Sequence, residues 1–325
     1  MSRESPSTTK DHRRRDPADV VPLLREQAGY GSLVLFLGAG VAHDAGLPTW
    51  AELVAPLRER LGLEQALDPL DVADYFVESE EGGRSALEQQ VRHSLRTPDG
   101  RREPARSGKL HRAIARVTAP VIFTTNFDQL TEEAIGAIQG VPPATIVDDR
   151  EVGVIDETWG VTLVKLHGCV SLPRTMVLTR TDFEEYATRH RAMIAYLHAL
   201  LATRTFLFVG FSLVDPNFRV IYRAIREALD GRARPAYALM PGEELTPLLQ
   251  GWRRRGMEPL LFPRLEDISA FVEDLAESRP RTPPSPLASH LDGLDRALVE
   301  MARAAREAAR ATANADEEAE ATLLR

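Results

Sequence analysis

Six short apolar runs, each closed by a turn or polar signal, are the feature that most limits how this chain can fold. They lie at 32–38, 120–126, 161–168, 205–212, 235–240 and 257–262. Their hydrophobicity is continuous rather than alternating, which is typical of strands buried on both faces of a parallel sheet. Helical patterns separate most of the runs, and strands that alternate with helices predict a doubly wound sheet. We therefore expect an α/β, Rossmann-like fold.

The stretches outside these runs predict the domain organisation. Residues 52–118 show helical patterns without a convincing strand, which indicates a helical insertion after the first strand. We expect a lead-in at 1–16, one α/β domain at 17–278, and a Pro-rich linker with a C-terminal helix at 279–325. That helix, with its apolar stripe at 291–301, is equally consistent with a frayed surface helix and with one that docks on the domain or on another subunit.

Three helix starts carry capping signals. Thr49 with Glu52, and Thr181 with Glu184, fit the capping box, in which a hydroxyl and a carboxylate satisfy each other's backbone N–H groups. Asp215 precedes a proline, which is the usual order of an N-cap and a first helical residue.

Composition narrows the class of partner. Lys and Arg number 40 against 48 Asp and Glu, and this net charge of −8 argues against nucleic acid as the main partner. The single cysteine, Cys169, rules out an internal disulfide and a Cys-only zinc site, so we expect no metal. The chain shows no apolar stretch of the roughly 18–20 residues that a membrane helix needs and no apolar signal-peptide core near residue 1. We expect a cytoplasmic protein.

Ligands of open α/β sheets bind outside the carboxyl ends of the strands, so the strand ends are the candidate site. The first run ends in Gly38-Ala39-Gly40, where a phosphate could approach the bare backbone and its N–H groups. The spacing does not fit G-x-G-x-x-G, and glycine turns after strands also arise for other reasons. Taken alone, this turn leaves nucleotide binding at even odds.

Three further strand ends carry polar residues. The second run ends in Thr124-Thr125-Asn126-Phe127-Asp128. Asp128 could bind a ligand or simply cap the following helix, but a helix cap does not explain why Asn126 lies at the strand end. His167, followed by a glycine, is a natural proton acceptor at a strand end, with His43 as its one serious rival. The remaining run ends in Gly210-Phe211-Ser212, where Ser212 could hydrogen-bond a ribose or phosphate.

Each signal is weak singly, but their order is informative. G-A-G with G-L-P downstream, T-x-N-x-D, H-G and G-x-S, each after a predicted strand, resembles the sirtuin family of NAD-consuming enzymes over roughly residues 30–275. The resemblance implies that Gly38, Ala39 and Gly40 form the phosphate turn. It implies that Thr124, Asn126 and Asp128 hold the nicotinamide ribose and assist cleavage, that His167 is catalytic, and that Gly210 and Ser212 contact the adenosine side of NAD.

Departures from the family pattern narrow the resemblance. A zinc module of four cysteines cannot be built, Thr49-Trp50-Ala51 replaces the usual acidic-Phe-Arg segment, and Ala42 replaces a common serine. These departures, together with Leu178-Thr179-Arg180-Thr181-Asp182-Phe183, resemble the zinc-less bacterial sirtuin-like proteins of anti-phage defence. The resemblance implies cleavage of NAD to nicotinamide and ADP-ribose, a homo-oligomer, and a phage-sensing domain or partner protein.

The implied mechanism assigns a role to each candidate catalytic residue. NAD is the substrate, and its pyrophosphate rests on the turn at 38–40, with a loop from Gly40 to Gly46 spanning the cofactor. Asn126 orients the attacking water or the ribose, His167 accepts a proton, and Asp128 holds Asn126 or the loop in register. Two alternatives stay open: a deacylase or ADP-ribosyltransferase that uses the same site, and a non-catalytic module that senses NAD or ADP-ribose.

Overall fold

The computed structural model describes residues 15–276, except 65–66, 80–81, 97–105, 158–159, 212, 214–218, 220–221 and 224–233. The predicted linker and C-terminal helix at 279–325 therefore lie outside the described residues, as do Ser212, the predicted cap at Asp215 and most of the predicted lead-in. None of the described helices is both long and apolar enough to cross a membrane.

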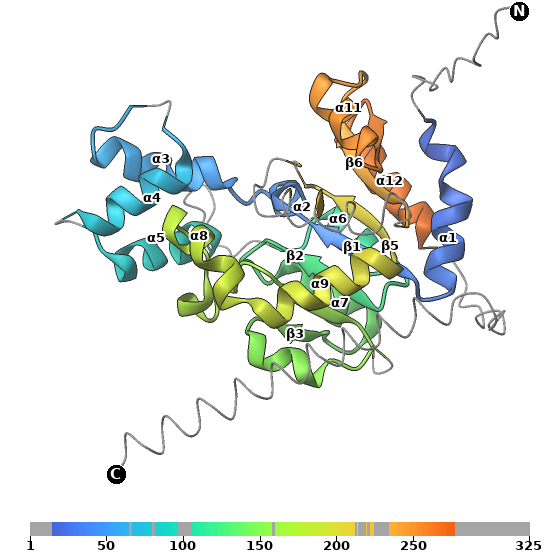
Figure 1. The fold of residues 1–325 in the computed structure, drawn as a ribbon, viewed down its shortest axis with the longest axis horizontal. Coiled ribbons are helices and arrows are strands. Elements are labelled where there is room, and N and C mark those ends of the chain that lie inside the picture. Colours follow the sequence, from blue (N-terminus) through green and yellow to red (C-terminus); the bar gives the residue numbers. More distant parts are fainter. Residues whose placement is uncertain are drawn as a thin grey trace, which may run out of the picture.

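A seven-stranded parallel sheet forms the centre of the molecule, in the order β3-β4-β2-β1-β5-β6-β7 (Figure 1). All six expected strands are present, and the predicted Rossmann-like α/β class is confirmed. The seventh, β3, was not predicted, because it has three residues of which only Ile146 is buried. The strands are β1 Leu33–Leu37, β2 Val121–Thr124, β3 Ala144–Ile146, β4 Thr162–Lys165, β5 Thr205–Val209, β6 Ala236–Pro241 and β7 Met257–Phe262.

Both faces of the sheet are covered, which explains why the strands read as unbroken apolar runs. In β1, for example, Leu33, Leu35 and Leu37 pack into one core, whereas Val34 and Phe36 pack into the other. The first core is closed by α1 Val21–Gly29, α6 Lys109–Ile114, α7 Leu130–Gln139 and α12 Leu265–Leu275. The second is closed by α9 Arg191–Thr203 and α11 Pro247–Arg254 together with the end of α8 Arg180–Arg189.

The helices between residue 50 and β2 fall into two groups. Helices α3 Trp50–Arg60, α4 Pro69–Glu78 and α5 Arg84–Arg96 share a separate core and form a lobe beside the sheet, next to α8 (Figure 1). Helix α6, which lies within the predicted insertion, instead packs on the sheet as the crossover helix between β1 and β2. We call α3–α5 the helical lobe.

Both predicted capping boxes can be tested. The Thr49 box is confirmed, because the backbone N–H of Glu52 donates to the Thr49 hydroxyl and Glu52 accepts from the Thr49 N–H. The Thr181 box is wrong by two residues: α8 begins at Arg180, and its box is formed by Thr179 and Asp182.

Candidate active site

The four strand ends that the sequence singled out belong to four consecutive strands, β4-β2-β1-β5. The register pairs Leu37 with Thr124 on one side and with Val209 on the other, and Thr124 with Lys165. Since neighbouring strands lie about 4.8 Å apart, the four tips span roughly 14 Å. The chain reverses its direction of winding between β1 and β5, so these tips surround the switch point where open α/β sheets bind ligands.

Backbone packing dominates the β1–β5 side of the site. Gly210 has a φ of +65°, and a Cβ atom there would lie 2.5 Å from the Val41 nitrogen. A Cβ on Gly38 would lie 2.5 Å from the Gly210 oxygen, and one on Gly40 would lie 2.8 Å from the Gly210 Cα. We call Gly38, Gly40 and Gly210 the glycine junction. The three glycines are needed for the two strand ends to meet, whatever they bind.

The N–H groups of this turn are mostly used within the protein. Gly38 donates to the Val209 carbonyl at 3.0 Å, and Gly40 donates to the Gly210 carbonyl at 2.8 Å. Ala39 is exposed, and its N–H has no acceptor among the described residues. Of the three predicted phosphate contacts, Ala39 is thus the residue whose N–H can still donate to an anion.

The expected loop from Gly40 to Gly46 is instead a short helix, α2 Ala39–Asp44. It ends in a Schellman motif: Gly46, with a φ of +82°, donates to His43 at 2.9 Å, and Leu47 donates to Ala42 at 3.1 Å. The first glycine pair therefore opens a helix and the third glycine closes it. His43 lies exposed on this helix, with its Nδ1 3.3 Å from the Leu47 carbonyl oxygen.

Asn126 joins the ends of β2 and β1. It is 7% exposed; its N–H donates to the Thr124 hydroxyl at 3.0 Å, and its side-chain Nδ2 donates to the Gly38 carbonyl at 3.1 Å. This second bond fixes the side on which the amide nitrogen lies, so Oδ1 is the atom of the amide that can accept from a ligand or a water. The Thr124 hydroxyl thus holds the backbone of Asn126 at the strand end.

Asp128 serves the scaffold as a cap. Its Oδ1 accepts from the Leu130 N–H at 3.0 Å at the start of α7, which is the simpler of the two sequence explanations. Its carbonyl accepts from the fully buried ammonium of Lys165, which also donates to Glu132 at 2.8 Å. Burial alone would lower the pKa of Lys165, but Glu132, Cys169 and Asp128 together raise it, so the ammonium stays charged.

His167 stands at the next tip, on the segment that leaves β4. This segment is tied to the β2 tip, because Leu166 donates to Thr124 and Val170 donates to Phe127, both at 2.9 Å. The partly exposed imidazole packs edge-on against Phe183, with ring centroids 5.0 Å apart, and near Tyr186 at 5.9 Å. His167 and Asn126 thus lie on segments at adjacent strand tips.

The backbone conformation explains why a glycine follows His167. Gly168 has a φ of +82°, and a Cβ there would lie 2.1 Å from the Thr175 oxygen. We call Asn126, Asp128, Lys165 and His167 the side-chain junction.

Two residues near the site were missed as participants. His111 on α6 is 1% exposed; its Nδ1 accepts from the Gly108 N–H at 3.3 Å, while its Nε2 has no hydrogen-bond partner among the described residues. Burial lowers the pKa of His111, and Asp128 and Asp44 nearby oppose that effect. Lys165 was the other, and its signal was a lone charge within an apolar run. Among the described residues, no group of three or more His, Cys, Asp or Glu side chains could hold a metal ion.

The fold and the strand-tip site are similar to those expected of a sirtuin-like α/β protein, and the comparisons agree with that similarity. The model of the SIR2-like domain family matches residues 120–260. It is 28% identical over 241 residues to "NAD(+) hydrolase ThsA" of Bacillus cereus, covering 73% of this chain and 49% of that protein.

Other relatives extend this picture. The ThsA protein of Acinetobacter baumannii is 29% identical over 210 residues, 64% of this chain and 42% of the relative. "Defense-associated sirtuin 2" of Bacillus subtilis is 24% identical over 213 residues, 63% of this chain and 20% of the relative. The chain spans about half the length of the ThsA proteins that it matches.

Proposed function

We propose that the protein is an NAD glycohydrolase that cleaves NAD to nicotinamide and ADP-ribose. The observation that carries the proposal is the meeting of the four sirtuin-like strand ends on four adjacent strands around one switch point. Similarity to several proteins named NAD(+) hydrolase supports the same activity. In this arrangement NAD lies across the tips, with its adenosine side at β5, its pyrophosphate at α2 and its nicotinamide ribose at β2 and β4. Gly210 and Ser212 would then face the adenosine, and Ala39 the pyrophosphate.

Positioning and electrostatics suffice for the chemistry. Nicotinamide leaves as a neutral ring from a positively charged pyridinium, so the enzyme needs to stabilise an oxocarbenium-like state and deliver water. The Oδ1 of Asn126 would accept a hydrogen bond from that water or from a ribose hydroxyl, because its Nδ2 is held by Gly38. His167 would accept the proton, and Asp128 would act as a positioning residue through its cap and its contact with Lys165.

We further propose that this activity serves anti-phage defence by depleting NAD, as the names of the relatives suggest. A cytoplasmic location, assembly into a homo-oligomer and control by a phage-sensing partner or domain belong to the same proposal. The reaction as written requires no metal.

The test is product analysis with purified protein and NAD. The proposal expects nicotinamide and free ADP-ribose in equal amounts, both lost in Asn126→Ala and in His167→Ala. ADP-ribose attached to protein, or nicotinamide release that depends on an acylated peptide, would instead identify the transferase or the deacylase. Tight NAD binding without nicotinamide release would identify a sensing module.

A further inference from the structure

A cavity of about 730 Å³ lies beside the candidate active site, within the size range of small-molecule pockets. Its walls come from α5, from the residues that follow β3, from residues 174–177 and from α8. None of the strand-tip residues Gly38, Ala39, Asn126, His167 or Gly210 lines it. Since β3 lies beyond β4 in the sheet, the cavity lies on the far side of His167 from the glycine junction.

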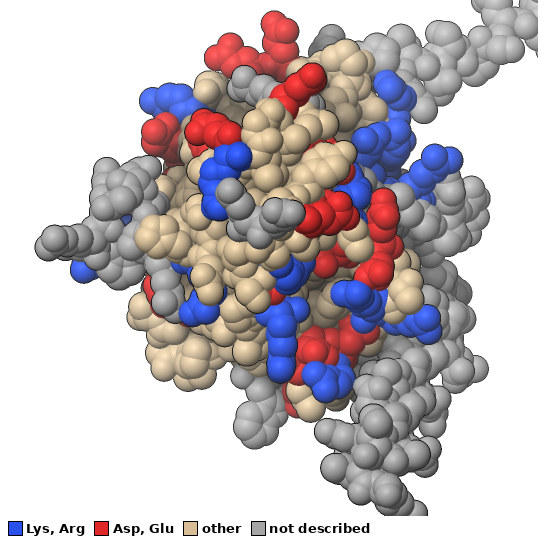
Figure 2. All heavy atoms as spheres, turned by 90° about the vertical axis from the view of Figure 1, so that its left-hand side faces the viewer, with Lys and Arg blue, Asp and Glu red and all other residues tan. Residues whose placement is uncertain are grey.

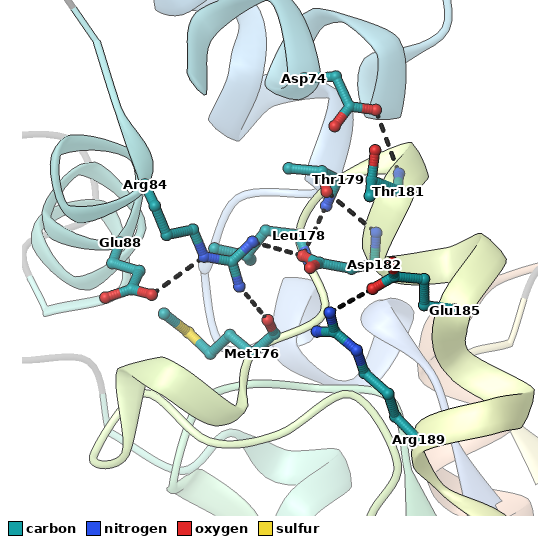
Figure 3. Close-up of polar contacts among 10 residues, drawn as sticks. All are labelled: Asp74, Arg84, Glu88, Met176, Leu178, Thr179, Thr181, Asp182, Glu185 and Arg189. Carbon is teal, nitrogen blue, oxygen red and sulfur yellow. Dashed lines mark hydrogen bonds and ion pairs between the residues drawn. The ribbon is translucent and has the colours of Figure 1, made fainter. Parts of the chain in front are cut away.

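Four carboxylates line this cavity, and each is already engaged by the protein. Asp149 accepts from the N–H groups of Ala192 and Met193 at 2.7 and 3.0 Å, at the start of α9. Asp182 accepts from Arg84 at 2.5 Å and from the Leu178 N–H at 2.8 Å, as Figure 3 shows.

The remaining two carboxylates are paired with arginines of the cavity wall. Glu88 pairs with Arg84 at 3.0 Å, and Asp148 pairs with Arg150 at 3.1 Å. All four carboxylates are therefore held by donors of the protein, three of them by Arg84 or Arg150 and Asp149 by backbone N–H groups.

Two basic residues of the wall, Arg174 and His190, keep polar atoms without a partner among the described residues. Arg174 lines the cavity, is exposed, and has no carboxylate partner among the described residues. The Nδ1 of His190 is buried at the wall and likewise has no partner. Burial lowers the pKa of His190, so its ring offers a neutral nitrogen as a hydrogen-bonding group, and the positive charge comes from Arg174. An arginine fork without a carboxylate partner favours an anion, and arginine recognises phosphate in particular.

The walls of the cavity reach His167 by direct contacts. Val177 donates to the His167 carbonyl at 3.0 Å. The Tyr186 ring lies between the His190 ring, at 4.6 Å, and the His167 ring, at 5.9 Å. A ligand that orders Arg174 and His190 thus acts on the two elements against which His167 rests.

We propose that this cavity binds a phosphate-bearing small molecule of nucleotide size, held by Arg174 and His190, and that its occupancy changes the rate of NAD cleavage through Tyr186 and Val177. The proposed ligand binding depends only on the residues of the cavity, whereas the proposed effect on the rate of NAD cleavage rests on the proposed function.

Calorimetric titration of the full chain with ADP tests the binding. The Asn126→Ala background prevents turnover, and saturating NAD occupies the strand-tip site. Arg174→Ala should weaken ADP binding by about 10- to 100-fold, the effect expected for loss of a charge-assisted hydrogen bond. Arg116→Ala, an exposed arginine on the opposite side of the sheet, should leave the affinity unchanged, and adenosine should bind far more weakly than ADP.

Several outcomes would overturn the site: no ADP binding, equal affinity in Arg174→Ala, equal affinity for adenosine, or displacement of ADP by NAD. In a second arm, ADP should change nicotinamide release by the wild type and lose that effect in Arg174→Ala. Absence of nicotinamide release altogether would count against the proposed function, and the titration would still decide on the site.

Discussion

The glycine junction and the side-chain junction lie at neighbouring strand tips, yet they are built in opposite ways. At the glycine junction, backbone meets backbone, and Gly38, Gly40 and Gly210 leave room for nothing larger than hydrogen. At the side-chain junction, buried polar groups hold the strand ends, with Asn126 bound to Gly38 and Lys165 bound to Glu132. The glycines of this motif are therefore required for packing, whether or not they also bind a ligand. The side chains with a capacity for chemistry are Asn126 and His167.

The largest effect on stability should come from Lys165→Met, which leaves the largely buried carboxylate of Glu132 without its cation. Breaking a buried ion pair in this way costs about 3–5 kcal/mol. Urea unfolding measures the loss. The double variant Lys165→Met with Glu132→Gln should recover part of it, because no uncompensated charge remains at Glu132. A loss as large as in the single variant would show that the pair between β4 and α7 is not the source of the effect.

Gly210→Ala tests the close backbone packing of the glycine junction. The left-handed φ costs roughly 1–2 kcal/mol for a non-glycine residue, and the contact with the Val41 backbone adds roughly 1–3 kcal/mol of overpacking. Thermal unfolding should show the loss even without NAD. Gly140→Ala, also at a positive φ but in open space, is the matched control and should lose only the conformational part. Equal losses in both variants would contradict the close packing.

A pH series tests the role of His111, the buried histidine of α6 near Asp128. Burial lowers the pKa of His111, so the folded state binds fewer protons than the unfolded state below about pH 6.5. Stability should therefore fall as the pH drops below that value, by at most about 1.4 kcal/mol per pH unit for this group.

In His111→Asn, where the amide can still accept from Gly108, that part of the slope should disappear. The exposed His93→Gln should follow the wild type. An unchanged slope in His111→Asn would show that His111 does not contribute to the pH dependence.

The smallest effect is expected where the helical lobe meets α8. Arg180 pairs with Asp71 at 2.8 Å and with Asp68 at 3.1 Å, and all three side chains are partly exposed. Arg180→Ala should cost at most about 1 kcal/mol, and less at high salt. Figure 2, which views the molecule from the side of the helical lobe, shows charges of both signs interspersed over this face. A loss of several kcal/mol would mean that the lobe depends on this contact far more than its exposure suggests.

The sequence predicted most of the sheet because burial on both faces leaves a continuous apolar run, as in β1 and β5. It missed β3, which is too short to show a pattern, and α2, whose six residues include two glycine-turn positions and no apolar period. The start of α8 was placed two residues late because Thr179 and Thr181 both precede an acidic residue at the capping distance.

The candidate site could be predicted as a set of strand ends but not as a set of contacts. The bond from Asn126 to Gly38 joins residues 88 positions apart, and the pair of Lys165 with Glu132 joins residues 33 apart. Such partners follow from strand order, which the apolar pattern alone does not give. The cavity beside His167 is formed by four segments that are separate in the sequence, so no local motif could predict it.

Comparing NAD binding with NAD cleavage in His167→Ala tests most directly whether the chemistry belongs to the side-chain junction. Nicotinamide release should fall by about 10²–10⁴-fold, the usual cost of removing a proton acceptor. NAD affinity and thermal unfolding should stay close to those of the wild type, since the glycine junction is untouched. Release of nicotinamide at the wild-type rate by folded His167→Ala would contradict the claim that chemistry belongs to the side-chain junction.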